Sequence, residues 1–150
     1  MDNLLPRAFA AAGLAAKYCP ESPIQGNTPR NVQIFTGILL HQGGKVVEQD
    51  TSEGKSISII LAAYLNGLSN GAHIMTSNDG LARRDAGTYG KILEYLGLNV
   101  GLLTEAGSVT DNKKAYEADV VYGQNTTFEF DYLMDNGPGV YSKDQQAQRV

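Results

Sequence analysis

The sequence has little of several residue types, and each shortage excludes a class of protein. Cys19 is the only cysteine among the 150 residues, which excludes an internal disulfide and a cysteine-based metal cluster and favours a reducing compartment. No apolar run approaches the roughly 20 residues of a membrane-spanning helix. Acidic residues outnumber basic ones by 16 to 12, for a net charge of -4. This balance argues against a protein that binds nucleic acid through charge alone, and the sequence carries no strong signal for nucleic-acid binding.

Apolar runs and chain breakers alternate along the chain in an order that predicts an α/β fold. Helices are expected over residues 4–18, 31–41, 55–68, 81–96, 110–118 and around 128–133, and strands over residues 45–48, 72–76, 99–104 and 119–123. Asn78 is predicted to cap the helix that follows it. Strands that alternate with helices favour a parallel sheet covered on both faces. Ligands of such sheets bind at the carboxyl ends of the strands.

The segment Gly54-Lys55-Ser56 lies at such an end, between a predicted strand and a predicted helix. This arrangement can hold a nucleotide phosphate, because backbone N–H groups and the helix N-terminus face the anion. The lysine then reaches the β- and γ-phosphates, and the serine hydroxyl ligates Mg²⁺. The match to the usual loop is incomplete, since Gln49 stands where the first glycine is expected. The alternative is an ordinary turn at the start of a helix.

Several collinear stretches carry a family resemblance. They are Asn-Val-Gln-Ile (31–34), Thr-Ser-Glu-Gly-Lys-Ser (51–56), Tyr-Leu-Asn-Gly-Leu (64–68), Thr-Ser-Asn-Asp-Gly-Leu-Ala-Arg-Arg-Asp (76–85), Glu-Tyr-Leu-Gly-Leu-Asn-Val-Gly (94–101) and Tyr-Gly-Gln-Asn-Thr-Thr-Phe-Glu-Phe-Asp-Tyr-Leu-Met-Asp-Asn (122–136). Together they resemble the first part of the first motor domain of SecA, the ATPase motor of bacterial preprotein translocation. The resemblance implies an α/β, RecA-like P-loop nucleotide-binding domain, here incomplete. Residues 1–30 would form a leading helix and a proline-rich connector, and residues 31–150 the partial DEAD-like domain.

The resemblance also implies a site for ATP and Mg²⁺. Its residues would be Gln33, Thr51, Ser52, Glu53, Gly54, Lys55 and Ser56. Gln33 would contact adenine, since a side-chain amide can both donate and accept, and Ser56 would reach Mg²⁺ through its hydroxyl. For Gln33 the alternative is a solvent-facing helix glutamine.

Two further groups match motifs that couple the translocated polymer to the nucleotide in related motors. They are Arg83, Arg84 and Asp85 in one motif, and Asp131 and Asp135 in another. The alternative in both cases is a solvated helix face. His41 and His73 are isolated along the chain, so no histidine metal site is expected. Cys19, beside Pro20, is expected to be a loop thiol.

The departures from the family pattern are informative. Ser52 replaces the first glycine of the family's Thr-Gly-Glu-Gly-Lys-Thr loop. If the backbone there needs a positive φ, serine in place of glycine destabilises that loop conformation by about 1 kcal/mol or more. Gly80, Glu129 and Met134 replace a tyrosine, a glycine and an arginine of the family, and the last change removes a cation.

SecA continues into a strand ending Asp-Glu-Val-Asp, whose carboxylates hold Mg²⁺ and orient the attacking water. These 150 residues contain no Asp-Glu pair, and residues 148–150 resemble the segment just before that strand. We therefore assign no catalytic residue and expect that this polypeptide alone does not hydrolyse ATP at a useful rate. We also expect marginal stability, or aggregation through an unpaired strand edge.

The function implied is the ATP-binding segment of a SecA-type motor that drives protein translocation across a membrane. Its partners would be a preprotein and a membrane channel, and its location the cytoplasm, with peripheral contact to the inner membrane. Two alternatives stay open: a DEAD-type ATPase resembling RNA helicases, and a degenerate, non-catalytic relative that only binds a partner.

Overall fold

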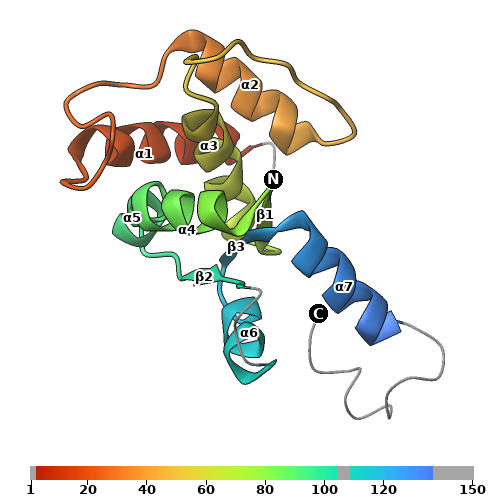
Figure 1. Ribbon diagram of the computed structural model, residues 1–150. Coiled ribbons are helices and arrows are strands. Elements are labelled where there is room, and N and C mark those ends of the chain that lie inside the picture. Colours follow the sequence, from red (N-terminus) through yellow and green to blue (C-terminus); the bar gives the residue numbers. More distant parts are fainter. Residues whose placement is uncertain (1–2, 105–108, 137–150) are drawn as a thin grey trace.

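Helices precede and then alternate with strands in the computed structural model, which describes residues 3–104 and 109–136 (Figure 1). Residues 148–150, compared above with the segment before an acidic strand, lie outside this part. The helices are α1 (Leu5–Tyr18), α2 (Asn31–Gln42), α3 (Lys55–Gly67), α4 (Asp79–Thr88), α5 (Gly90–Tyr95), α6 (Val109–Tyr116) and α7 (Asn125–Asn136). The strands are β1 (Ala72–Thr76), β2 (Val100–Leu102) and β3 (Val120–Gln124).

The three strands form one parallel sheet in the order β1-β3-β2. Side chains alternate between its two faces along β3, as the pleat of a strand requires. Val120 and Tyr122 join a core with residues of α1, α3 and α5, whereas Val121 packs against Phe128 of α7 and Leu103. Figure 1 shows α1, α2 and α3 grouped at one end of the molecule and α6 and α7 at the other. The predicted α/β fold, with a parallel sheet flanked by helices, is confirmed.

The prediction of a strand over residues 45–48 is wrong, and the described sheet therefore has three strands instead of four. Gly43 and Gly44, with φ of 69° and 64°, turn the chain after α2, and the residues that follow have no regular structure. Val46 is fully exposed. A strand needs a neighbour to pair its N–H and C=O groups, and this apolar run has none in the described part of the chain.

The helix expected over residues 81–96 is divided into α4 and α5 at Tyr89. Gly87 and Gly90 flank the break, and glycine weakens a helix. Gly90 is buried against β2, where an added Cβ would lie 3.2 Å from Val100 Cγ1. The break therefore lets the chain approach the sheet closely. The cap at Asn78 is confirmed, since its Oδ1 accepts a hydrogen bond from the Leu81 N–H at 2.8 Å.

The leading helix α1 shares its core with α3 and α5. Its buried face is small and mostly alanine, with Phe9 packing beside Leu61 and Leu65 of α3. Cys19, expected as a loop thiol, is fully buried in the main core. The division of the chain at residue 30 stays a prediction.

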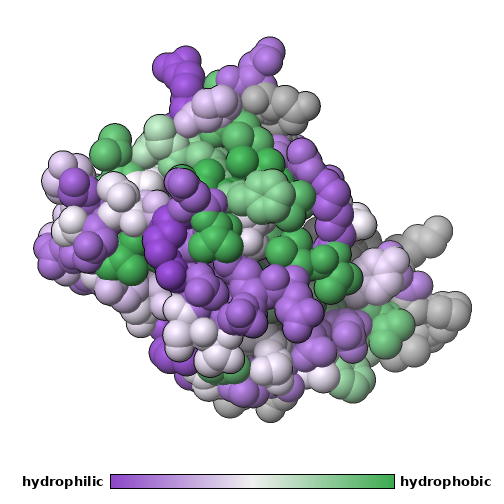
Figure 2. All heavy atoms as spheres, turned by 90° about the horizontal axis from the view of Figure 1, so that it is seen from above, coloured by the Kyte–Doolittle hydropathy of each residue, from purple (hydrophilic) through white to green (hydrophobic). Residues whose placement is uncertain are grey.

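The helix α2 is confirmed, but its buried face is not its apolar one. Gln33, Thr36 and Gly37 are buried, whereas Val32 and Phe35 are 42% and 61% exposed. Figure 2 looks down on the end of the molecule that carries α1 and α2 and shows apolar side chains among polar ones. An added Cβ on Gly37 would lie 3.0 Å from the Ser58 carbonyl oxygen, so α2 approaches α3 through its small residues.

One edge of β1 is unpaired among the described residues, as expected, because β1 pairs only with β3. Met75 on this strand is 57% exposed. Such an edge offers unpaired N–H and C=O groups to another chain. None of the helices in residues 3–104 and 109–136 has both the length and the apolar character needed to span a membrane.

Candidate functional site

The site is the loop before α3, where the backbone takes an unusual alternating conformation. Ser52 has φ of 69° and Gly54 has φ of 77°, while Glu53 between them is not in the positive-φ region. Ser52 is the only non-glycine residue with positive φ in the described chain. The position left in doubt by the missing family glycine therefore does use a left-handed conformation, which a Cβ disfavours by about 1–2 kcal/mol. Alternation of this kind is typical of concave backbone segments that bind anions.

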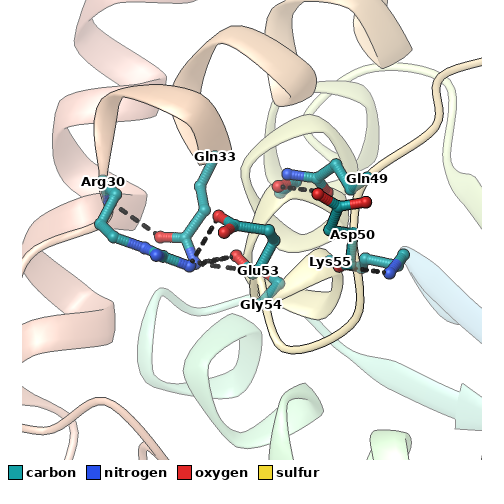
Figure 3. Close-up of polar contacts among 8 residues, drawn as sticks. Arg30, Gln33, Gln49, Asp50, Glu53, Gly54 and Lys55 are labelled. Carbon is teal, nitrogen blue, oxygen red and sulfur yellow. Dashed lines mark hydrogen bonds and ion pairs between the residues drawn. The ribbon is translucent and has the colours of Figure 1, made fainter.

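The loop leads directly into the N-terminus of α3. Lys55 is the first residue of this helix, and no side chain caps it. The first N–H groups of a helix have no partner within it, and the helix dipole makes this end positive. The Lys55 ammonium group donates to the Asp50 carbonyl oxygen at 2.7 Å, so it lies across the loop (Figure 3). One ammonium group and the backbone donors of a helix start thus lie within residues 50–56, beside the carboxylates of Asp50 and Glu53, of which the second is paired with Arg30.

Gln33 ties α2 to this loop through the nitrogen of its side-chain amide, while the amide oxygen binds the start of α2. Its Nε2 donates to the Glu53 carbonyl oxygen at 2.9 Å, and its Oε1 accepts from the Arg30 N–H at 2.8 Å. The side chain is buried, which excludes the solvent-facing alternative. Gly54 leaves room for it, because an added Cβ would lie 2.2 Å from Gln33 Nε2. Glycine is therefore favoured at position 54 by its φ, and a Cβ there would displace the Gln33 amide.

Arg30 contacts the same loop residue and was not anticipated from the sequence. Its guanidinium group donates to the Glu53 carbonyl oxygen at 2.6 Å and forms an ion pair with the Glu53 carboxylate at 3.1 Å. Figure 3 shows Arg30 and Gln33 together on the side of the loop that faces α2. An arginine at the start of α2 and an acidic residue in the loop were the only signals available, and they lie 23 residues apart.

Gln49 supports the loop from the other side. Its Oε1 accepts from the buried Ser58 hydroxyl of α3 at 3.4 Å, whereas its buried Nε2 has no partner in the described part of the chain. An unsatisfied buried donor costs about 1–3 kcal/mol. Gln49 is therefore a second place, with Ser52, where this loop departs from the usual sequence at a cost in stability.

The remaining predicted loop residues differ in accessibility. Thr51 is exposed, and Ser56 is half-buried as the second residue of α3. No group of three or more His, Cys, Asp or Glu side chains within the described ranges could hold a metal ion. A Mg²⁺ ion at Ser56 would therefore depend on oxygens that a nucleotide brings.

The first predicted coupling group lies on α4, where its contacts are local. Arg83 pairs with Asp79 at 2.8 Å and Arg84 with Asp85 at 2.7 Å, with both arginine side chains more than half exposed. Burial, and secondarily the charge of Asp85, raises the pKa of Tyr122 on β3. Asp85 thus faces the sheet while the two arginines face solvent.

The second predicted coupling group lies on α7 and is not simply surface charge. Asp131 is half-buried and accepts a hydrogen bond from the Tyr116 hydroxyl at 2.9 Å, and Asp135 is buried. The same region contains His73, which stacks on Phe128 with ring centroids 4.9 Å apart. His41 is hydrogen-bonded to Asn66 at 2.8 Å. The two histidines thus contact different residues.

Comparison with known proteins identifies the family. The family model of the SecA DEAD-like domain matches residues 1–150. The chain is 45% identical to the protein translocase subunit SecA of Rubrobacter xylanophilus, over 99% of this chain and 16% of that protein. The corresponding identities are 43% for Dichelobacter nodosus and 44% for Acinetobacter baylyi, with the same coverage. The chain thus spans 16% of the length of these relatives. Because the match extends along the whole sequence, this chain belongs to the SecA DEAD-like domain family.

Proposed function

We propose that this chain is the ATP-binding segment of a protein-translocating motor, and that residues 50–56 hold the phosphates. The observation that carries the proposal is the alternating backbone at Ser52 and Gly54, which ends at the uncapped helix start occupied by Lys55. Backbone donors, a helix N-terminus and an ammonium group together suit an anion of high charge.

The residues present fit a nucleotide with Mg²⁺. Gly54 has no Cβ to block the backbone, and the exposed Lys55 side chain can turn from the Asp50 carbonyl oxygen to a phosphate oxygen. The Ser56 hydroxyl is the group proposed to reach Mg²⁺, together with phosphate oxygens. ATP, when bound, supplies the phosphoryl group whose transfer to water releases the free energy that such motors use.

Gln33 is proposed to serve the base and the loop at once. Its Nε2 is engaged by the Glu53 carbonyl oxygen, and its Oε1 accepts one hydrogen bond, from the Arg30 N–H. A carbonyl-type oxygen has a second lone pair. That lone pair is the one suited to an exocyclic amino group, such as that of adenine. Base recognition and loop conformation would then be linked through a single side chain.

The wider role is proposed from the relatives, whose name is protein translocase subunit. In a longer protein this segment would contribute to ATP-driven movement of a preprotein through a membrane channel, from the cytoplasmic side. Arg83, Arg84 and Asp85 on α4, and Asp131 and Asp135 on α7, are the residues proposed to transmit nucleotide state to the moving polypeptide. No observation favours the RNA helicase alternative.

Equilibrium binding of a fluorescent ATP analogue with Mg²⁺ tests the proposal. Lys55→Ala should weaken binding by at least tenfold, because it removes the loop ammonium group. The matched control is Lys91→Ala, which removes another exposed lysine, paired with Glu94 on α5, and should leave affinity unchanged. Absence of binding by the folded parent chain, or equal loss in both variants, would reject the phosphate site.

A further inference from the structure

We propose that Arg30 is a positioning residue for the phosphate loop, acting through the Glu53 peptide group. The inference rests on the proposed function of residues 50–56. Arg30 comes from the connector that precedes α2, and it reaches the loop across 23 residues of sequence. Its role would be to hold the backbone of residues 52–54 in the conformation that receives a phosphate.

The Glu53 carbonyl oxygen is held by two donors from the same side. Arg30 Nη2 lies 2.6 Å away and Gln33 Nε2 lies 2.9 Å away. Arg30 also pairs with the Glu53 carboxylate at 3.1 Å, so main chain and side chain of this residue are both fixed. In turn, Gln33 accepts from the Arg30 N–H. The three residues form a closed set of contacts between α2 and the loop.

Fixing this carbonyl group also fixes the direction of the next N–H group. The peptide unit is planar and trans, so the Glu53 C=O and the Gly54 N–H point in opposite directions. With the carbonyl group held toward α2, the Gly54 N–H points away from α2. This N–H lies between Ser52 and Lys55 in the segment proposed to bind phosphate, so its direction decides whether it can donate to an anion.

The loop of this chain needs such a restraint because Ser52 does not favour its own conformation. A serine at φ of 69° tends to return to negative φ, which would rotate the adjoining peptide groups. Gln33 supplies a neutral restraint, and Arg30 adds one that carries charge, which makes a stronger hydrogen bond. The Arg30 side chain is 54% exposed, so its ion pair contributes little to overall stability. Removing Arg30 should therefore change the conformation of the loop more than the stability of the whole chain.

The test is a double-mutant cycle on Mg²⁺–ATP affinity with the parent chain, Arg30→Gln, Ser52→Gly and the double variant. In the parent background, Arg30→Gln should raise the Kd about five- to tenfold, because the competent loop conformation becomes less populated. In the Ser52→Gly background the same change should raise the Kd less than twofold, because glycine adopts the left-handed conformation unaided. Arg7→Gln, on the exposed side of α1, is the matched control and should change nothing.

Equal losses in the two backgrounds would overturn the proposal, since Arg30 would then act on the nucleotide without the loop. The absence of any loss would overturn it as well. If neither the parent nor the Ser52→Gly protein binds ATP while folded, the proposed function fails. In that case, amide hydrogen exchange of residues 50–56 tests whether Arg30 positions the loop. Exchange faster in Arg30→Gln than in Arg7→Gln supports a positioning role, and unchanged exchange overturns it.

Discussion

Replacing Ser52 by glycine should stabilise this protein, although serine-to-glycine changes in loops usually do the opposite. Ser52 is exposed and has φ of 69°, a conformation that costs a residue with a Cβ about 1–2 kcal/mol. Glycine removes this strain. Glycine also has more conformational freedom in the unfolded chain, and this opposing effect disfavours folding by about 0.5–1 kcal/mol. The expected net effect is therefore a gain of about 0.5–1 kcal/mol in the free energy of unfolding.

The gain is measurable by urea and thermal denaturation. For a domain of this size it should raise Tm by about 1–4 °C. Ser52→Ala is the control, because it removes the hydroxyl group and keeps the Cβ, so it should give no gain. If Ser52→Gly instead lowers the free energy of unfolding by about 0.5–1 kcal/mol, as in an unstrained loop, Ser52 is not left-handed in solution. Residues 50–56 would then lack the alternating backbone conformation on which the proposed phosphate site depends.

Three further predictions follow from other contacts. Gly54→Ala should lower the free energy of unfolding by about 1–2 kcal/mol. The new Cβ is strained at positive φ and displaces the Gln33 amide, whose Nε2 would lie 2.2 Å away, whereas the smaller freedom of alanine in the unfolded chain offsets about 0.5–1 kcal/mol. Denaturation no different from the parent would contradict this. Contacts with Tyr116 and Phe128 desolvate part of the otherwise exposed His73 ring and lower its pKa below 6.5, so the folded state slightly favours neutral imidazole. The small stability that it contributes is full above pH 6.5 and lost as pH falls through the folded pKa. His73→Phe should reduce the difference in urea midpoint between pH 7.5 and 5.5, and an unchanged difference would count against the assignment. Met75→Lys on β1, whose outer edge has no partner strand among residues 3–104 and 109–136, should slow aggregation without altering far-UV circular dichroism. Equal aggregation rates would exclude this edge as the route.

Elements fixed by local sequence were predictable. The strand over residues 72–76 and the cap at Asn78 match the structure, because a short apolar run between breakers and an Asn before a helix act over a few residues. The prediction of a strand over residues 45–48 failed because a strand forms only when a neighbouring strand pairs with its backbone, and none pairs with Val46 in the described chain. Pairing is a long-range property that a run of three or four residues does not contain.

The candidate site was only partly predictable for the same reason. The Gly-Lys-Ser sequence located the loop, and the missing glycine identified Ser52 as the residue to question. Arg30 could not be found this way, because its contact with Glu53 depends on how α2 packs on α3. That packing uses small and polar residues, with Gln33 and Gly37 buried and Phe35 exposed, so apolar periodicity did not reveal which face of α2 turns inward.

A titration of ¹⁵N-labelled protein with Mg²⁺–ATP shows whether the loop before α3 binds nucleotide phosphates. We expect saturable shifts of the backbone amides of Gly54, Lys55 and Ser56, accompanied by a shift of the Gln33 side-chain amide. AMP, which lacks the β- and γ-phosphates, should leave the loop amides nearly unmoved. Saturable shifts centred elsewhere, or none in the loop at millimolar ATP, would contradict a phosphate site in this loop.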